Sequence, residues 1–449
     1  MAAERVNLLD FDREQLTRWC DSLGEKPFRA VQLTRWIHRN LESDFSKMTN
    51  LAKSFREKLE AMAEVRPPEP MREQISSDGT RKWAFDVGNG NAVEAVYIPE
   101  VDRGTLCIST QAGCAMGCLF CSTGKQGFAR NLKTSEIVGQ LFWAERELRR
   151  EAGTDNPNER VITNVVLMGM GEPLQNLEAV VPAIRLFLDD HAYGISRRRV
   201  TVSTSGLTNQ MDKLAELAPV ALAVSLHAPT DELRDKIMPV NRAYDVEKLF
   251  DACHRYFKKT GRRISFEYAM IDGVNDHDWQ ADLIAKKLKG MPGHVNLIPL
   301  NDVVESPLKP SRRVAAFQKR LESHGLTATV RRSLGGDIDA SCGQLRRKEM
   351  EERKNPEKTA VPAGIFYYNI KDPMIKKEGE MTPEEIEKQI LKQLRMNGLV
   401  NSDLEVIHHL DREIQKESDV IPVAIKDGYV QEAKSSVAGQ KRFDVLRHY

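Results

Sequence analysis

The chain has 449 residues, of which 41% are hydrophobic, and its 66 Lys and Arg residues almost balance its 65 Asp and Glu residues. This length predicts about two or three domains with ordinary hydrophobic cores. The net charge of +1 excludes a uniformly cationic protein, so contact with nucleic acid would require local basic patches. No apolar run is long enough to cross a membrane, and the acidic N-terminus lacks the apolar core of a secretory signal. We therefore expect a cytoplasmic protein without membrane contacts.

Residues 1–65 are predicted to form a helical domain. Four apolar residues recur at helical spacing after Pro27: Ala30, Leu33, Ile37 and Leu41. This spacing places them on one face of an amphipathic helix, which is expected to bury that face against neighbouring helices.

Residues 66–99 follow a proline-rich break and are predicted to form a β-hairpin connection. Stretches of β-forming residues at 81–89 and 91–99 flank a Gly-Asn-Gly sequence. Glycine and asparagine readily adopt the backbone conformations of a tight turn, so the two stretches are expected to pair as antiparallel strands.

From about residue 100, β-rich stretches alternate with helical patterns. Six such stretches are TLCIST, ITNVVLM, RRVTVSTS, ALAVSLH, ISFEYAM and VNLIPL, and a seventh, TATVRR, follows them. The clearest helical pattern covers residues 134–150, with Thr134 or Ser135 as the expected cap. The alternation predicts an α/β fold with a parallel sheet, either an incomplete barrel or a doubly wound sheet. Functional side chains are then expected at the carboxyl ends of the strands.

Three of the seven cysteines lie within eight residues, in the motif Cys114-Ala-Met-Gly-Cys118-Leu-Phe-Cys121. The odd count and this clustering disfavour a disulfide framework. Thiolates are the usual ligands of iron–sulfur clusters, and three of them on a cubane leave one iron free to bind another molecule. Zinc with a distant fourth ligand, or small buried side chains without a ligand role, remain as alternatives.

This motif resembles that of the radical S-adenosylmethionine (SAM) superfamily. There the free iron chelates the amino and carboxylate groups of SAM, and one electron from the cluster cleaves SAM to a 5′-deoxyadenosyl radical. The phrase MGMGEP resembles the superfamily's glycine- and glutamate-containing segment after the second strand. The resemblance implies that Gly171 lets the backbone approach the methionine amine and that Glu172 accepts a hydrogen bond from it. Alone, Gly-Glu-Pro would indicate a turn.

Residues 1 to about 350 resemble one family more closely, the RlmN methyltransferases of ribosomal and transfer RNA, which act on adenine C2. The matching phrases follow one another in order: GEKPFRA, SSDGTRKWA, VEAVYIPE, RGTLCIST, GCAMGCLFCSTGKQGFARNL, NVVLMGMGEPLQN, RRVTVSTSG, AVSLHAP, NLIPLN and DIDASCGQL. The resemblance implies an incomplete (βα)6 TIM-like barrel of the radical SAM type over 100–350, with an N-terminal helical accessory domain. It also implies SAM and one [4Fe–4S] cluster as cofactors, the cluster being held by Cys114, Cys118 and Cys121.

The same resemblance assigns roles to two further cysteines and a glutamate. It implies that Cys342 carries the methyl group and that Cys107 resolves it through a transient disulfide. One SAM would methylate Cys342, and a second would supply the radical that activates this methyl group for addition to adenine C2. Glu94 is the implied proton acceptor. Taken alone, both cysteines would be interpreted as core residues and Glu94 as an outward-facing carboxylate.

Polar residues near strand ends complete the implied site. The resemblance assigns SAM contacts to Ser203, Ser225, Leu226, His227 and Asn301, although His227 alone would as readily be a core histidine. Candidate RNA contacts are the basic residues Lys125, Arg130, Lys133, Arg197, Arg198, Arg199, Arg331 and Arg332, although charge runs are commonly solvated surfaces. The implied partners of a monomeric enzyme are 23S rRNA, tRNA at position 37 and an electron donor such as flavodoxin.

Two other functions remain open from the sequence. One keeps the chemistry but directs it to adenine C8, as in the related Cfr methyltransferases, because no short motif separates C2 from C8. The other is an RNA-binding or redox-sensing protein whose cluster is not catalytic. A sensor would have no need of Cys107 and Cys342 in these sequence contexts.

Residues 351–449 lie beyond the resemblance to the RlmN family. An amphipathic helix is predicted from Thr382 to Gly398. The phrases VPAGIFYYNIKDPMI and AKSSVAGQKRFDVL resemble a C-terminal stretch of the AddB subunit of helicase–nucleases, without that nuclease's carboxylate–lysine core or cluster cysteines. We expect an α+β tail without nuclease activity, produced by a chimeric or mis-joined reading frame. A small RNA-binding extension is the alternative.

Overall fold

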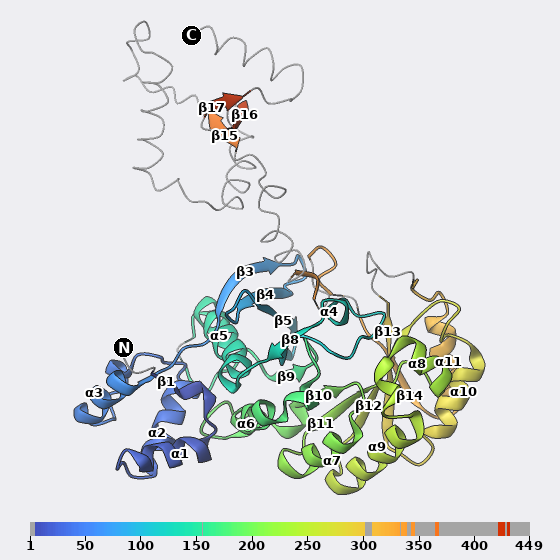
Figure 1. Ribbon diagram of the computed structural model, residues 1–449, viewed down its shortest axis with the longest axis horizontal. Coiled ribbons are helices and arrows are strands. Elements are labelled where there is room, and N and C mark those ends of the chain that lie inside the picture. Colours follow the sequence, from blue (N-terminus) through green and yellow to red (C-terminus); the bar gives the residue numbers. More distant parts are fainter. Residues whose placement is uncertain are drawn as a thin grey trace, which may run out of the picture. The chain divides into compact units, whose positions relative to one another are not determined.

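A computed structural model describes residues 5–154, 156–300, 308–332, 334–338, 343–345, 364–367, 421–426 and 429–431. The chain forms two compact units, Met1–Met350 and Glu351–Tyr449 (Figure 1). Three strands of the second unit form an antiparallel sheet: β15 (Gly364–Tyr367), β16 (Ile421–Lys426) and β17 (Tyr429–Gln431). The helix predicted from Thr382 lies outside the described residues.

The first unit begins with a small helical region, as the sequence predicts. Its elements are β1 (Val6–Asn7), η1 (Leu8–Asp10), α1 (Arg13–Ser22), α2 (Phe28–Thr34), η2 (Arg35–Arg39), η3 (Phe45–Lys47), α3 (Lys53–Met62) and β2 (Ala63–Glu64). The predicted helix is shorter than expected, because α2 widens into a π-helical turn at Arg35 and Leu41 adopts a left-handed φ of 56°. Its apolar face is nevertheless the buried one, since Ala30, Leu33 and Ile37 are wholly buried.

A ten-stranded sheet forms the centre of this unit, in the order β14-β13-β12-β11-β10-β9-β6-β5-β4-β3. Seven neighbouring strands run parallel: β6 (Arg103–Cys107), β9 (Asn164–Leu167), β10 (Val200–Thr204), β11 (Ala221–Ser225), β12 (Ile264–Met270), β13 (Gly293–Pro299) and β14 (Thr327–Val330). They comprise the six predicted strands and, at the edge, the seventh β-rich stretch. Because the parallel strands follow one another in chain order without reversal, the open sheet is an incomplete TIM-like barrel and not a doubly wound sheet.

Three antiparallel strands extend the sheet beyond β6. They are β3 (Glu69–Ile75), β4 (Arg81–Asp86) and β5 (Ala92–Glu100). Strands β4 and β5 form the predicted hairpin, and β3 pairs with the outer edge of β4. Because β5 also pairs with β6, the hairpin is continuous with the parallel sheet.

Helices connect the parallel strands and pack on one face of the sheet (Figure 1). They are α5 (Thr134–Ala152), α6 (Leu177–Leu188), α7 (Thr208–Leu217), α8 (Asp231–Ile237), α9 (Val246–Thr260), α10 (Asp278–Lys287) and α11 (Val314–Ser323). The prediction that Thr134 or Ser135 caps α5 is wrong, because the cap residue is Lys133. The carboxylate of Glu136 accepts a hydrogen bond from the Lys133 amide, and that of Asp10 accepts one from the Ser135 amide, at 2.8 Å each. These carboxylates satisfy amides that a capping hydroxyl would otherwise bind.

The two faces of the parallel strands differ in polarity. Val202, Val224 and Phe266 are fully buried, and the Phe266 ring stacks on Phe250 of α9 at 5.8 Å between ring centroids. Successive strand residues point to opposite faces, so partly accessible serines such as Ser203 lie on the face away from the helices. None of the described helices is both long and apolar enough to span a membrane.

Candidate functional site

The three clustered cysteines lie on one loop beside the carboxyl end of β6. Strands β7 (Gln111–Gly113) and β8 (Phe128–Asn131) pair at the base of this loop, and the short helix α4 (Ser122–Lys125) follows its last cysteine. The Cys114 amide donates to the Gly127 carbonyl at 2.9 Å, and the Leu119 amide donates to the Ile237 carbonyl at 3.0 Å. The second bond ties the loop to the end of α8.

Two thiols of this loop, those of Cys114 and Cys118, lie in an environment that disfavours negative charge. Burial raises the pKa of Cys114 to about 12 and that of Cys118 further, and the neighbouring thiols and the Glu172 carboxylate act in the same direction. Bound iron would offset this cost, because a coordinating cation favours the thiolate. Among the described residues, no three Cys, His, Asp or Glu side chains form a ligand set for a single metal ion. Three thiols on one short loop are nevertheless the kind of donor set that an iron–sulfur cluster takes.

The predicted Gly171–Glu172 segment lies against this loop. Gly171 has a φ of 102°, and an added Cβ would stand 2.5 Å from the Cβ of Gln111, so only glycine allows the approach. The Glu172 amide donates to the Gln111 side chain at 2.8 Å. The Glu172 carboxylate is buried and accepts hydrogen bonds from the amide and hydroxyl of Ser205, at 2.7 Å each. Burial raises the pKa of Glu172, although the bonds from Ser205 oppose this effect.

The predicted residues on β10 and β11 lie at neighbouring strand ends. Ser203 is on β10, while Ser225 ends β11 and is followed by the wholly buried Leu226. His227 has a φ of 53° and lies at a T-shaped angle to Phe120 of the cysteine loop, with ring centroids 4.5 Å apart.

The His227 imidazole is neutral. Its Nδ1 accepts a hydrogen bond from the Ala269 amide at 2.8 Å, so its proton is on Nε2. Burial lowers the pKa of His227 to about 3, and the Arg234 cation acts in the same direction. The predicted Asn301 lies outside the described residues.

Arg234 is a buried residue at these strand ends that the sequence analysis did not identify. Its guanidinium donates to the carbonyls of Ser205, Ser225 and Leu226, at 2.6, 2.9 and 3.0 Å. Burial lowers its pKa to about 10, so it is still cationic at neutral pH. Arg234 therefore fixes the ends of β10 and β11 relative to one another. The surrounding sequence, DELRDK, gave no signal, because it looks like an exposed charged helix.

Glu94 and Cys107 lie on adjacent strands, together with Lys82. The interpretation of Glu94 as an outward-facing carboxylate is wrong, because β5 lies inside the sheet and only 2% of the Glu94 side chain is exposed. The Lys82 ammonium lies 2.9 Å from the Glu94 carboxylate. Val96 of β5 pairs with Lys82 of β4 on one side and with Cys107 of β6 on the other. Lys82, Val96 and Cys107 therefore form one row across the three strands, and Glu94 lies two residues from Val96 on β5. Burial raises the pKa of the Cys107 thiol.

Gly343, the residue after Cys342, contacts both Glu94 on β5 and Gln126 after the cysteine loop. Its amide donates to the Glu94 carboxylate at 2.6 Å, and its carbonyl accepts a hydrogen bond from the Gln126 side chain at 2.7 Å. Cys342 itself lies outside the described residues. The residue that follows it nevertheless joins the Glu94 strand to the segment after the cysteine loop.

The candidate RNA contacts divide into several groups. Arg130 donates to both carboxylate oxygens of Glu136, at 2.6 and 2.8 Å, so its charge is compensated. The arginines at 197–199 precede β10 and therefore lie at the amino ends of the parallel strands, away from the cysteine loop. Lys125 ends α4, and Arg331 follows β14, so these two remain close to the carboxyl ends.

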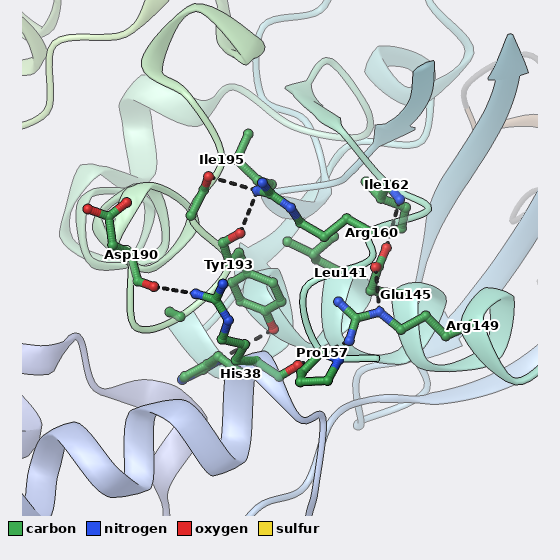
Figure 2. A pocket seen from close by; sticks show the side chains of 13 residues that line it. His38, Leu141, Glu145, Arg149, Pro157, Arg160, Ile162, Asp190, Tyr193 and Ile195 are labelled. Carbon is green, nitrogen blue, oxygen red and sulfur yellow. Dashed lines mark hydrogen bonds and ion pairs between the residues drawn. The ribbon is translucent and has the colours of Figure 1, made fainter. Parts of the chain in front are cut away.

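A pocket of about 220 Å³ lies apart from these residues (Figure 2). Its walls include Arg39, Arg149, Arg160, Asp190 and residues 192–195, most of them from segments that precede β9 or β10. The guanidiniums of Arg39 and Arg160 donate to backbone carbonyls, and that of Arg149 donates to Glu145 at 2.7 Å. The pocket is thus part of a polar junction between the N-terminal helices and the barrel.

Comparison with known proteins assigns the family. The model of the ribosomal RNA large subunit methyltransferase N-terminal domain matches residues 6–65, and that of the radical SAM superfamily matches residues 108–283. A radical SAM methyltransferase from Sphaerobacter thermophilus is 43% identical, with a TM-score of 0.69 over 76% of this chain and 98% of that chain.

More distant matches include a domain of pyruvate-formate lyase-activating enzyme from Bacteroides vulgatus, 22% identical, with a TM-score of 0.29 over 38% of this chain and 99% of that chain. Another is SuiB from Streptococcus suis, 12% identical, with a TM-score of 0.37 over 51% of this chain and 52% of that chain. The superfamily's cofactors are a [4Fe–4S] cluster and SAM, as the sequence predicts. Because the Sphaerobacter protein is matched almost end to end at 43% identity, this chain belongs to the radical SAM methyltransferases, of the RlmN type.

Proposed function

We propose that this radical SAM rRNA methyltransferase methylates C2 of adenine, in 23S rRNA and at position 37 of tRNA, with Cys342 as the methyl carrier. The observation that supports this best is the hydrogen bond from Gly343 to Glu94. It joins the residue after the proposed carrier to the proposed proton acceptor, on the strand that pairs with that of Cys107. A non-catalytic cluster protein has no need of this grouping.

The chemistry of adenine C2 explains why two cysteines would be required. C2 is an amidine carbon without a nucleophilic lone pair, so it cannot displace the methyl group of SAM directly. A thiolate can take that methyl group, which is the role proposed for Cys342. The bound cluster and SAM supply one-electron cleavage and a radical that removes hydrogen from an unactivated methyl group.

The remaining proposed steps belong to side chains of this chain. Glu94 takes the proton that leaves adenine C2, and the adjacent Lys82 stabilises its carboxylate. Removal of that proton leaves an adduct with one unpaired electron, which the oxidised cluster would accept. The Cys107 thiolate then attacks the Cys342 sulfur, so that a disulfide forms as the bond from sulfur to the transferred carbon breaks. That carbon takes up a proton and becomes the methyl group. The raised pKa of Cys107, caused by burial, means that its thiol must lose a proton before this attack.

We assign SAM binding to the strand ends around the cysteine loop. The proposed contacts are Gly171, Glu172, Ser203, Ser225, Leu226, His227 and Asn301. Support comes from the position of the Gly171–Glu172 segment against Gln111, next to the loop. The neutral His227 imidazole, packed against Phe120, has an Nε2 proton that it can donate. Cys114, Cys118 and Cys121 would hold the cluster.

RNA is the substrate class of this family, and the finer partners belong to the proposal. A target adenine in folded RNA must be splayed out to reach a buried site. The basic residues best placed for its phosphates are Lys125, Arg331 and Arg332. Lys125 ends α4, and the two arginines follow β14, so all three are close to the carboxyl ends of the strands. We also propose a monomeric cytoplasmic enzyme that takes electrons from a donor such as flavodoxin.

Nucleoside analysis tests this function. The reconstituted enzyme, reductant, SAM and a 23S rRNA fragment or tRNA are incubated, and the digested nucleosides are identified by mass spectrometry. We expect 2-methyladenosine from the wild-type enzyme and from Cys253→Ala, a matched control at a buried cysteine of α9, but none from Cys342→Ala. A product of 8-methyladenosine would instead support the Cfr-like alternative, and activity of Cys342→Ala would contradict the carrier role.

A further inference from the structure

Lys82 is a fully buried lysine in the middle of the sheet. Its ammonium lies 2.9 Å from the carboxylate of Glu94, and the exposed fractions of the two side chains are 0% and 2%. Burying two charges is costly even when they are paired, and a well-packed apolar pair often gives equal or greater stability. Stability of the fold therefore does not explain why this buried pair is present, and we look for its role in the candidate functional site.

The pair lies next to a residue of the proposed reaction. Lys82 and Cys107 both pair with Val96, from the two sides of β5. Glu94 is two residues from Val96 and so lies on the same face of the sheet. Lys82, Glu94 and Cys107 therefore share one small patch of that face.

Glu94 also holds a segment that is distant in sequence. The carboxylate oxygen that faces Lys82 accepts the hydrogen bond from the Gly343 amide at 2.6 Å. From the other side, the Gln126 side chain donates to the Gly343 carbonyl at 2.7 Å. The φ of Gly343 is 80°, and an added Cβ would lie 2.6 Å from the Thr123 hydroxyl. Gly343 is thus held between β5 and the segment after the cysteine loop.

We propose that Lys82 is a positioning residue: its ammonium fixes the Glu94 carboxylate, which holds Gly343, the residue that follows the proposed methyl carrier Cys342. An ionised carboxylate accepts a stronger hydrogen bond than a neutral one. A buried carboxylate without a counter-charge is strongly disfavoured. This inference rests on the proposed function for the role of Cys342, but the contact between Glu94 and Gly343 does not depend on it.

Amide hydrogen exchange at Gly343 tests the holding step directly. Cluster-loaded enzyme without RNA is compared as wild type, Lys82→Met, Lys82→Arg and Arg81→Met, with exchange resolved to Gly343 by mass spectrometry. Arg81 is the matched control, since it neighbours Lys82 on β4 but pairs with Glu151 and Glu73 instead. We expect the Gly343 amide to exchange at least about tenfold faster in Lys82→Met, because Glu94 loses its charge-assisted hydrogen bond from Lys82 and then holds Gly343 less firmly. Lys82→Arg should recover part of the protection, and Arg81→Met should match the wild type.

Equal protection of Gly343 in Lys82→Met and the wild type would overturn the proposal. If Lys82→Met does not unfold cooperatively, Lys82→Gln replaces it, because glutamine can still donate to Glu94 but carries no charge. Gly343 should again exchange faster than in the wild type, and equal exchange would again refute the role of Lys82.

The methyl occupancy of Cys342, measured on the same samples, separates this inference from the proposed function. We expect it to fall in Lys82→Met and to recover in part in Lys82→Arg. If the wild-type enzyme carries no methyl group on Cys342, the proposed function fails, and the Gly343 exchange data still decide the role of Lys82.

Discussion

Gly343→Ala should disrupt the site with little effect on the fold. The native φ of 80° lies in the left-handed region, which costs a residue with a Cβ about 1–2 kcal/mol. The added Cβ would also lie 2.6 Å from the Thr123 hydroxyl and 3.0 Å from the Thr123 amide nitrogen. Overpacking of this kind costs about 1–3 kcal/mol. The sum of roughly 2–5 kcal/mol predicts that the native arrangement of Gly343 is populated at least about 30-fold less in the variant than in the wild type.

Steady-state methylation of RNA measures this effect. We expect a methylation rate at least about 30-fold below that of the wild type, since each 1.4 kcal/mol is a factor of about ten. The melting temperature should change little, because a short segment can detach locally without global unfolding. Gly336→Ala is the matched control, because no atom lies within 4 Å of its added Cβ and its φ is not left-handed. A Gly343→Ala enzyme with the wild-type rate would refute the reasoning.

The other predictions concern the cluster, the second cysteine and the tail. Alanine at Cys114, Cys118 or Cys121 should abolish both the cluster absorbance and methylation. A reducible cluster with full activity in any of these variants would contradict the ligand assignment. Cys107→Ala should accumulate a covalent enzyme–RNA adduct on a denaturing gel, whereas normal turnover without an adduct would exclude the two-cysteine mechanism. In the wild type, decay of that adduct should accelerate with pH, because burial raises the Cys107 pKa and only the thiolate attacks. Deletion of residues 356–449 should leave iron content and methylation unchanged, and a large loss of either would assign the tail to the enzyme.

The sheet could be predicted from the sequence because its strands have a simple physical signature. Buried parallel strands are short runs of β-branched and apolar residues, and those of β10 and β11 are interrupted only by serines on the accessible face. The turn at 88–90 located the hairpin for the same local reason. The cysteine loop could be predicted because all three proposed cluster ligands lie within eight consecutive residues, so that their spacing is visible in the sequence.

The residues that escaped prediction depend on contacts distant in sequence. Lys82 was not identified, and Glu94 taken alone was interpreted as an outward-facing carboxylate, since nothing local shows that β5 is paired on both sides. Arg234 reads as an exposed helical residue, although it binds three carbonyls at the ends of β10 and β11. The cap of α5 was misplaced because Asp10, more than a hundred residues away, supplies an acceptor. Charged residues are buried where the fold supplies partners for them, and a local sequence pattern does not show which distant residues those partners are.

The proposed methyl transfer through Cys342 to adenine C2 is tested most directly with SAM that carries a fully deuterated methyl group. Over several turnovers, the methylated nucleoside is isolated and its position and deuterium content are determined by mass spectrometry. The proposed route predicts 2-methyladenosine with two deuterium atoms, because one is removed when the Cys342-bound methyl group is activated and a proton later replaces it. A methyl group with all three deuterium atoms, or a methyl group at another position of adenine, would contradict it.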